Sequence, residues 1–268
     1  MLINKLKRFV HIEPKISGDF CVFLNYSDKH FEKHPQRDFL QIACFDPGII
    51  NTGCRIEKRH IDEAGTGFIL VETLFQTRIQ TASRVPKDKR NPGVKGSKDK
   101  EQKCVRKSTE QHYYMKMART IYDIRRELRE CDYILVESQL SRNPEAIRMS
   151  QHIVSTILAV SCDFGLLDKE GTSAQRPLIV EVAPYFKSRY FGVRKHRGLD
   201  LKKWATIKAF DILERNGDTI ARDIIKKDRK KDDQSDVILY CEAWGNTILG
   251  HDETVLMRHA SDDDSCSE

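Results

Sequence analysis

Four acidic side chains stand at the ends of predicted strands or at the start of a predicted helix. Asp46 ends one apolar run and Glu137 ends another, whereas Asp233 and Asp236 open a helix and share one face of it. Carboxylates at such places are costly unless a cation meets them. Hard divalent ions such as Mg²⁺ prefer carboxylate oxygens, and two of them about 4 Å apart support hydrolysis or transfer at a phosphodiester. Taken singly, each acid could instead be a turn, cap or solvated residue.

The elements that must position these acids follow a definite order. Strands are predicted at residues 39–46, 52–61, 68–75, 133–136 and 178–182, and helices at about 108–130, 145–162, 202–215 and 233–249. A three-strand meander followed by alternating helices and strands predicts an α/β fold, a ribonuclease-H-like five-stranded mixed sheet flanked by helices. In that order the first and fourth strands are neighbours, so Asp46 and Glu137 should lie side by side.

Apolar residues at helical spacing predict the buried faces of the helices. The candidates are Tyr114, Met117, Ile121, Ile124, Leu128, Ile147, Ile153, Ile157, Val160, Trp204, Ile207, Phe210 and Leu213. Gly217 is expected to end the third helix.

Composition favours one well-solvated domain with a polyanionic partner. Charged residues make up 32% of the 268 residues and the net charge is +6, a mild basic excess. The eight cysteines are scattered without C-x-x-C spacing, which indicates buried thiols in a reducing, intracellular compartment. No apolar stretch approaches the length of a membrane span and the N-terminus lacks a signal-peptide core, so neither a membrane nor secretion is expected.

The chain divides into three expected regions. Residues 1–37 form an extension whose role is open, and residues 38–250 form the predicted nuclease domain. That domain carries a basic insertion at 78–107, which is too polar and too rich in proline and glycine to pack. Residues 251–268 form an acidic tail that is expected to be disordered.

Three acidic motifs carry a family resemblance. Cys44-Phe-Asp46-Pro-Gly-Ile-Ile-Asn-Thr-Gly53, Ile134-Leu-Val-Glu137-Ser-Gln and Lys231-Asp-Asp-Gln-Ser-Asp236-Val-Ile-Leu resemble those of RuvC-like Holliday junction resolvases. The versions in poxviruses, other large DNA viruses and fungal mitochondria are the most similar. The likeness spans roughly Phe39 to Gly250.

This resemblance implies a RuvC-type ribonuclease-H-like fold and a homodimeric endonuclease that nicks four-way DNA junctions during recombination and repair. It also implies two Mg²⁺ ions per active site, for which Mn²⁺ may substitute, with Asp46, Glu137, Asp233 and Asp236 as catalytic and metal-binding residues. If the chain is viral, it would act where viral DNA replicates. The long insertion and residues 1–37 depart from the compact bacterial pattern, which leaves the choice of substrate less determined than the chemistry.

Basic segments supply candidate DNA contacts. The candidates are Lys87, Lys89, Arg90 and Lys95 in the insertion, Arg189, Arg194, Lys195 and Arg197 in an aromatic basic segment, and Lys202 at a helix start. Lys203 could hold the scissile phosphate or stabilise its developing charge. The run Lys226 to Lys231 could steer DNA toward the acids. Each segment could equally be a solvated surface, and the aromatic residues of the second could belong to the core.

Other functions share parts of this pattern. The loop from Asp46 to Gly53 resembles the first phosphate loop of actin-like sugar kinases, but those enzymes need a second domain and a second such loop, so no nucleotide cofactor is expected. A non-catalytic junction-binding protein would gain nothing from four carboxylates. A ribonuclease-H-fold nuclease for flaps or RNA–DNA hybrids keeps the chemistry and changes only the substrate.

Overall fold

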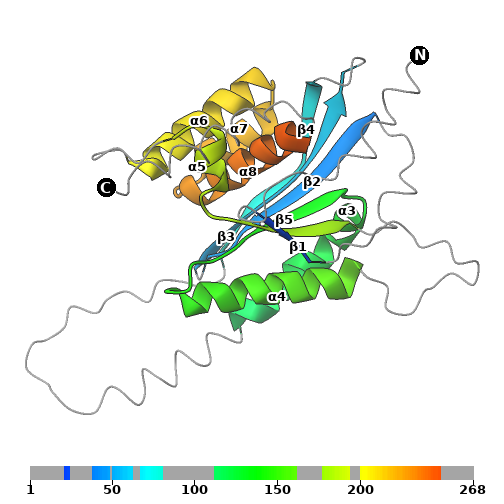
Figure 1. Cartoon of the computed structure of the whole chain (residues 1–268), viewed down its shortest axis with the longest axis vertical. Coiled ribbons are helices and arrows are strands. Elements are labelled where there is room, and N and C mark those ends of the chain that lie inside the picture. The colour runs from blue at the N-terminus through cyan, green and yellow to red at the C-terminus, as the bar shows by residue number, and fades with distance from the viewer. Residues whose placement is uncertain are drawn as a thin grey trace, which may run out of the picture.

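A computed structural model describes residues 21–24, 38–48, 50–62, 67–80, 112–161, 177–193 and 200–248 (Figure 1). A mixed sheet forms the middle layer, with helices on both of its faces. The strands are β1 (Cys21–Phe23), β2 (Phe39–Asp46), β3 (Asn51–Ile61), β4 (Phe68–Gln80), β5 (Tyr133–Glu137) and β6 (Leu178–Val182). The helices are α3 (Arg125–Arg129), α4 (Pro144–Ser161), α5 (Phe186–Tyr190), α6 (Leu201–Arg215), α7 (Thr219–Lys227) and α8 (Asp232–Ile248). Residues 112–123 are also helical and lead into α3.

The strands lie in the order β1-β6-β5-β2-β3-β4. β3 is antiparallel to β2 and to β4, whereas β5 pairs in parallel with both β2 and β6. The five strands predicted from the sequence therefore have the expected ribonuclease-H-like arrangement, and the predicted fold class is confirmed. β1 adds a sixth, antiparallel strand beside β6. It belongs to the segment 1–37, whose role the sequence left open.

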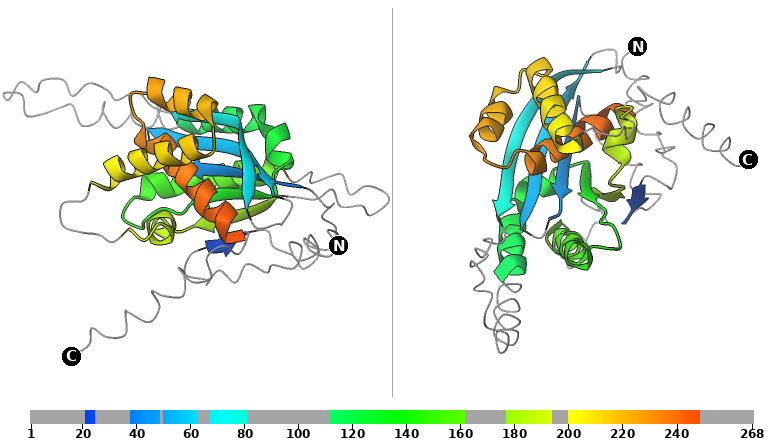
Figure 2. Two further views of the ribbon diagram at one scale, coloured as in Figure 1. Left: turned by 90° about the horizontal axis from the view of Figure 1, so that it is seen from above. Right: turned by 90° about the vertical axis from the view of Figure 1, so that its left-hand side faces the viewer.

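Successive residues of β2 point into two separate cores. Ile42 and Cys44 pack with α8 and α5, whereas Ala43 and Phe45 pack with residues 112–129 and α4. A strand buried on both faces is mostly apolar, as the run in the sequence indicated, and Gln41 is its buried polar exception. The two further views show α8 lying across the sheet, with α6 outside it (Figure 2).

Most predicted core positions are buried, including Met117, Ile121, Leu128, Ile153 and Ile157. Ile147, Val160, Trp204 and Phe210 are only partly buried.

The prediction that Ile207 is a core residue is wrong, because its side chain is 53% exposed. The smaller residues Ala205 and Ala209 face the core instead and let α6 approach α8 closely. The sequence did not predict α7, but it did predict the stop at Gly217, whose φ of 66° favours glycine.

Five cysteines, Cys21, Cys44, Cys54, Cys131 and Cys241, are buried free thiols, as predicted. The other three lie outside the described residues. Within the described ranges, no helix has both the length and the apolar character that crossing a membrane requires.

The packing of α6 can be tested with two truncations of similar size. Leu213→Ala should lower the free energy of unfolding by about 3 kcal/mol, because it leaves a cavity in the core beneath α6. Ile207→Ala should change it by less than about 0.5 kcal/mol, because this side chain is mostly in water. Equal losses in urea unfolding would show that the described face of α6 is not the packed one.

Candidate active site

Asp46 and Glu137 leave the sheet at the same edge. The last paired residues of β2 and β5 are Phe45 and Val136, and the two acids follow them directly. Both carboxylates are partly buried, and they lie within hydrogen-bonding reach of each other. The parallel pairing predicted from the element order therefore brings these two acids together.

The backbone of helix α8 lies in close contact with the backbone of β3 at this edge. Gly53 of β3 pairs with Asp46 and faces the start of α8. A Cβ atom at Gly53 would lie 2.2 Å from the carbonyl oxygen of Asp233, so only glycine fits there. This contact brings Asp236, one turn further along α8, toward the two strand acids.

Lys187 provides the cation that these acids share. It lies on α5, just after β6, and its Nζ is 2.9 Å from Asp236 Oδ2 and 3.7 Å from Glu137 Oε2. The same Nζ lies 4.6 Å from the centre of the Tyr240 ring. Tyr240 in turn donates hydrogen bonds from its hydroxyl to the carbonyl oxygens of Ala183 and Pro184, which ties α8 to the segment that leads into α5.

The charges of this cluster depend strongly on one another. Burial alone would lower the pKa of Lys187, but the charges of Glu137, Asp236 and Asp46 outweigh it and raise that pKa. Burial, followed by the charge of Glu137, raises the pKa of Asp46 well above its usual value, although Lys187 opposes this shift. Three carboxylates thus converge on one ammonium group.

The donor chemistry fits a divalent metal, although the described arrangement is closed around an ammonium ion. Glu137 Oε2 is buried and accepts no hydrogen bond, so a hard carboxylate oxygen is left without a strong partner. Among the described residues, no three His, Cys, Asp or Glu side chains are placed to hold a metal ion as they stand. Lys187 accounts for this, because its Nζ occupies the position that the acids face.

Asp233 does not join the other three acids. Both of its carboxylate oxygens lie 2.8 Å from Lys230 Nζ, one turn before it at the start of α8. Burial raises the pKa of Asp233, and Lys230 opposes that rise. The neighbouring Asp232 binds Lys202 Nζ at 2.6 Å. Of the four expected acids, three therefore lie around Lys187, whereas Asp233 binds Lys230 beside the separate contact of Asp232 with Lys202.

The predicted DNA contacts are only partly covered by the structure. Lys203 is exposed at the start of α6, where Asp200 caps the helix by accepting from the amides of Lys202 and Lys203. Arg189 is partly buried, with its guanidinium 5.8 Å from the Tyr185 ring. The remaining candidates lie outside the described residues: Lys87, Lys89, Arg90, Lys95, Arg194, Lys195 and Arg197.

Sequence reasoning did not assign Lys187 or Lys230 to the site. Both lie in basic segments that it considered for DNA binding. The signal for Lys187 was its place shortly after β6, a strand that pairs with β5 and ends at the same edge. Lys187 itself lies beyond the end of β6, on α5, so the rule that selected Asp46 and Glu137 as residues at strand ends did not reach it.

Comparisons with known proteins bear on the fold. No protein-family model matches the sequence, and no curated protein matches it. The chain is similar in structure to Thermus thermophilus RuvC, with 13% identity, a TM-score of 0.39, and 77% of this chain and 95% of that one covered. It is also similar to T. thermophilus RuvC in complex with Holliday junction substrate, with 11% identity, a TM-score of 0.42, and 77% and 94% covered.

A third similar structure is the yeast mitochondrial Holliday junction resolvase Ydc2. The identity is 14%, the TM-score is 0.49, and 82% of this chain and 86% of that one are covered. At such low identity the likeness concerns the fold alone, and the function must be inferred from the residues of the site.

The role of Lys187 can be tested by Lys187→Met, which keeps the length of the side chain and removes its charge. We expect the free energy of unfolding at pH 8 to fall by about 3 kcal/mol, because partly buried carboxylates lose their cation. Lys203→Met, an exposed lysine nearby, is the control and should change little.

The loss should shrink as the pH falls. The pKa of Asp46 in the folded state lies above its unfolded value of about 4. Below about pH 4 the Asp46 carboxyl group is therefore neutral in both states, and in the folded protein it is fully charged only above the raised pKa. Urea unfolding of Lys187→Met at pH 5 and pH 8 measures this. A loss equal at both values would contradict the assignment of Lys187 to the charge of these acids.

Proposed function

We propose that the chain is a divalent-metal-dependent endonuclease of the RuvC-like type that resolves four-way DNA junctions. The observation that carries this proposal is the convergence of Asp46, Glu137 and Asp236 on one cation position, from two neighbouring strands and a helix. Such an arrangement is costly to build and has a clear use in phosphodiester hydrolysis. As a structural feature alone, it would destabilise the protein.

Asp46, Glu137 and Asp236 would hold the metal, and Asp233 is the fourth ligand if its carboxylate leaves Lys230. When bound, a pair of Mg²⁺ ions, or of Mn²⁺ in their place, supplies an activated water and stabilises charge on the leaving oxygen. Glu137 offers its Oε2 without breaking a hydrogen bond, since that atom accepts none.

Lys187 has two roles in this proposal. Without metal, its ammonium group neutralises part of the repulsion among the acids, which keeps the start of α8 close to the ends of β2 and β5. With a metal bound, Lys187 would leave the acids and would lie beside them to hold a phosphate oxygen. Lys202 and Lys230, beside the acids at the starts of α6 and α8, extend the positive surface.

The choice of substrate rests on the three acidic motifs and on the basic segments beside them. Four-way junctions are cut on paired strands, so we propose a homodimer with one active site in each copy. The likeness of the motifs to those of large DNA viruses leads us to propose that type, acting in a reducing compartment inside the cell.

The substrate can be tested directly. The protein is incubated with a mobile four-way junction, a linear duplex, a flap and an RNA–DNA hybrid, each with and without Mg²⁺. We expect nicks on paired strands of the junction only when Mg²⁺ is present. Equal cleavage of the plain duplex would contradict junction specificity, and preference for the flap or hybrid would leave a different nuclease of the same fold.

The site residues can be tested by Asp46→Asn and Glu137→Gln. Each should lower the cleavage rate by about 100- to 1,000-fold, the cost of losing one group that stabilises charge. Junction binding should stay equal or become tighter, because a negative charge next to the phosphates is removed. Asp232→Asn is the matched control, since its carboxylate binds Lys202 and lies near Lys230 but does not contact Lys187, and it should cleave within a few-fold of the unaltered protein. A normal rate in either site variant would refute the assignment.

A further inference from the structure

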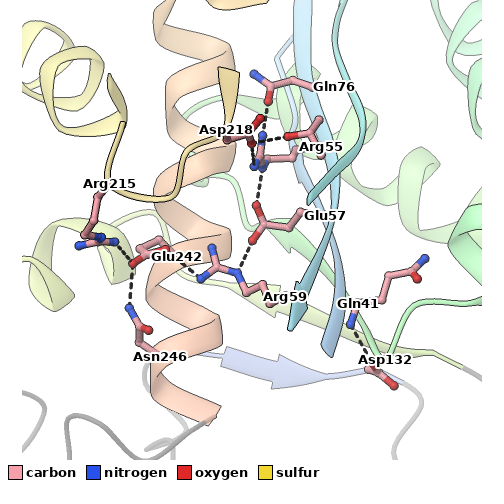
Figure 3. Close-up of polar contacts among 11 residues, drawn as sticks. Gln41, Arg55, Glu57, Arg59, Gln76, Asp132, Arg215, Asp218, Glu242 and Asn246 are labelled. Atoms are coloured by element: carbon pink, nitrogen blue, oxygen red, sulfur yellow. Dashed lines mark hydrogen bonds and ion pairs between the residues drawn. The ribbon is translucent and has the colours of Figure 1, made fainter. Parts of the chain in front are cut away.

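A set of buried ionic side chains joins β3 to α7 and α8 (Figure 3). We call Arg55, Glu57, Arg59, Asp218 and Glu242 the charge ladder. None of the five is more than 6% exposed. Charged residues are rarely buried this completely, so the ladder needs a reason.

Each rung of the ladder is an ion pair. Glu57 accepts from Nε of Arg55 through one carboxylate oxygen and from Nε of Arg59 through the other. Arg59 Nη1 reaches Glu242 Oε2 on α8 at 2.8 Å. Arg55 Nη2 reaches Asp218 Oδ2, the N-cap of α7, at 2.8 Å. The three residues of β3 thus hold α8 at one end and α7 at the other.

Hydrogen bonds continue from the ladder toward the acids. Gln76 accepts from Arg55 and donates to Gln234 Oε1 at 3.1 Å, and Gln234 donates to Asp228 Oδ2. Asp228 also binds Arg78 Nε at 2.8 Å. Since Gln234 lies between the two acids of α8, the polar contacts of this helix reach the turn that carries the site.

Stability does not explain the ladder. Removing charges from water is expensive, and well-packed apolar side chains of similar volume often serve stability as well or better. With Arg215 at its rim, which also binds Glu242, the ladder balances three positive charges against three negative ones. Ionic contacts differ from apolar ones in being directional, because the rigid donors of a guanidinium group bind carboxylates in only a few geometries.

Close contacts at both ends of α8 make its position consequential. At the start of the helix, Gly53 leaves no room beneath the carbonyl of Asp233. Toward its end, Gly245 faces Arg59, and a Cβ atom there would lie 3.1 Å from Arg59 Cδ and 3.2 Å from Arg59 Nε. A slide or rotation of α8 would therefore move Asp236 away from Glu137.

We propose that Arg59 and Glu242 are positioning residues that set the register of α8, so that Asp236 meets Asp46 and Glu137. This inference deepens the proposed function and rests on it. Glu242 lies on the helix that carries the acids but contacts none of them. Its effect is transmitted by the rigid helix.

The test is the double variant Arg59→Met/Glu242→Met in the full chain. It removes one positive and one negative charge together and keeps the side chains long, so the remaining charges stay balanced. We expect its melting temperature without metal to equal or exceed that of the unaltered protein. Its affinity for Mn²⁺ in the absence of DNA, measured by calorimetry, should fall about 10- to 100-fold, and junction cleavage should fall with it while junction binding stays unchanged.

The matched control is His60→Met/Glu72→Met. His60 lies on β3, as Arg59 does, and its Nε2 is 3.6 Å from Glu72 Oε2 on β4, so this contact does not involve α8. Its Mn²⁺ affinity should equal that of the unaltered protein. Glu242→Gln, which keeps the shape of the side chain, is a second variant and should weaken Mn²⁺ binding without abolishing the fold.

The outcomes separate the two proposals. If the unaltered protein neither binds Mn²⁺ nor cleaves a junction, the proposed function fails. If it does both and the double variant binds Mn²⁺ equally well, the positioning role is refuted. Failure of both the double variant and Glu242→Gln to fold would assign the ladder to stability and would also overturn the proposal.

Discussion

Repulsion among three carboxylates is the constraint around which this structure is arranged. Asp46, Glu137 and Asp236 come from three separate elements, and the charge of Lys187 compensates for bringing them together. The ammonium group is supplied by α5, a helix of five residues that follows β6 directly. A lysine and a metal meet the same need in different ways, since the lysine offers one mobile charge and a metal offers two fixed ones. Under the proposed function, a metal would take the position among the acids that Lys187 holds here.

Helix α8 serves two environments at once. One side of it carries Asp236 and Tyr240 toward the ends of β2 and β5, and another carries Glu242 toward the arginines of β3. The rest of the helix is mostly buried, with Val237, Cys241 and Trp244 in the core. Few helices of a small domain combine so much apolar burial with so many ionic contacts. Because Asp236 of the site and Glu242 of the charge ladder lie on the same helix, a movement of α8 would change the geometry of both.

The strands were predictable because β2, β5 and β6 are mostly apolar runs that end at or just before polar or breaking residues. Their order followed from the alternation of helices and strands, and it was enough to place Asp46 beside Glu137. Lys187 and the pairing of Asp233 with Lys230 were not predictable in the same way, because each depends on how a short helix or turn folds back on the edge of the sheet.

Arg55, Glu57 and Arg59 are a further case. In the sequence they are the alternating polar residues of a strand, a pattern typical of a solvent-facing surface. They are buried only because α8 brings a glutamate over them, and that contact joins residues about 180 positions apart, beyond the reach of local periodicity.

The short strand β1 has a consequence for how this sheet can meet other chains. By pairing with β6, it covers one edge of the sheet and removes an open row of backbone donors and acceptors there. Among the described strands, β4 is left as the long uncovered edge, with 13 residues and with Ile69, Leu70 and Leu74 exposed. The two edges of the sheet are therefore unequal, since β1 offers three residues and β4 offers thirteen to a strand from another molecule.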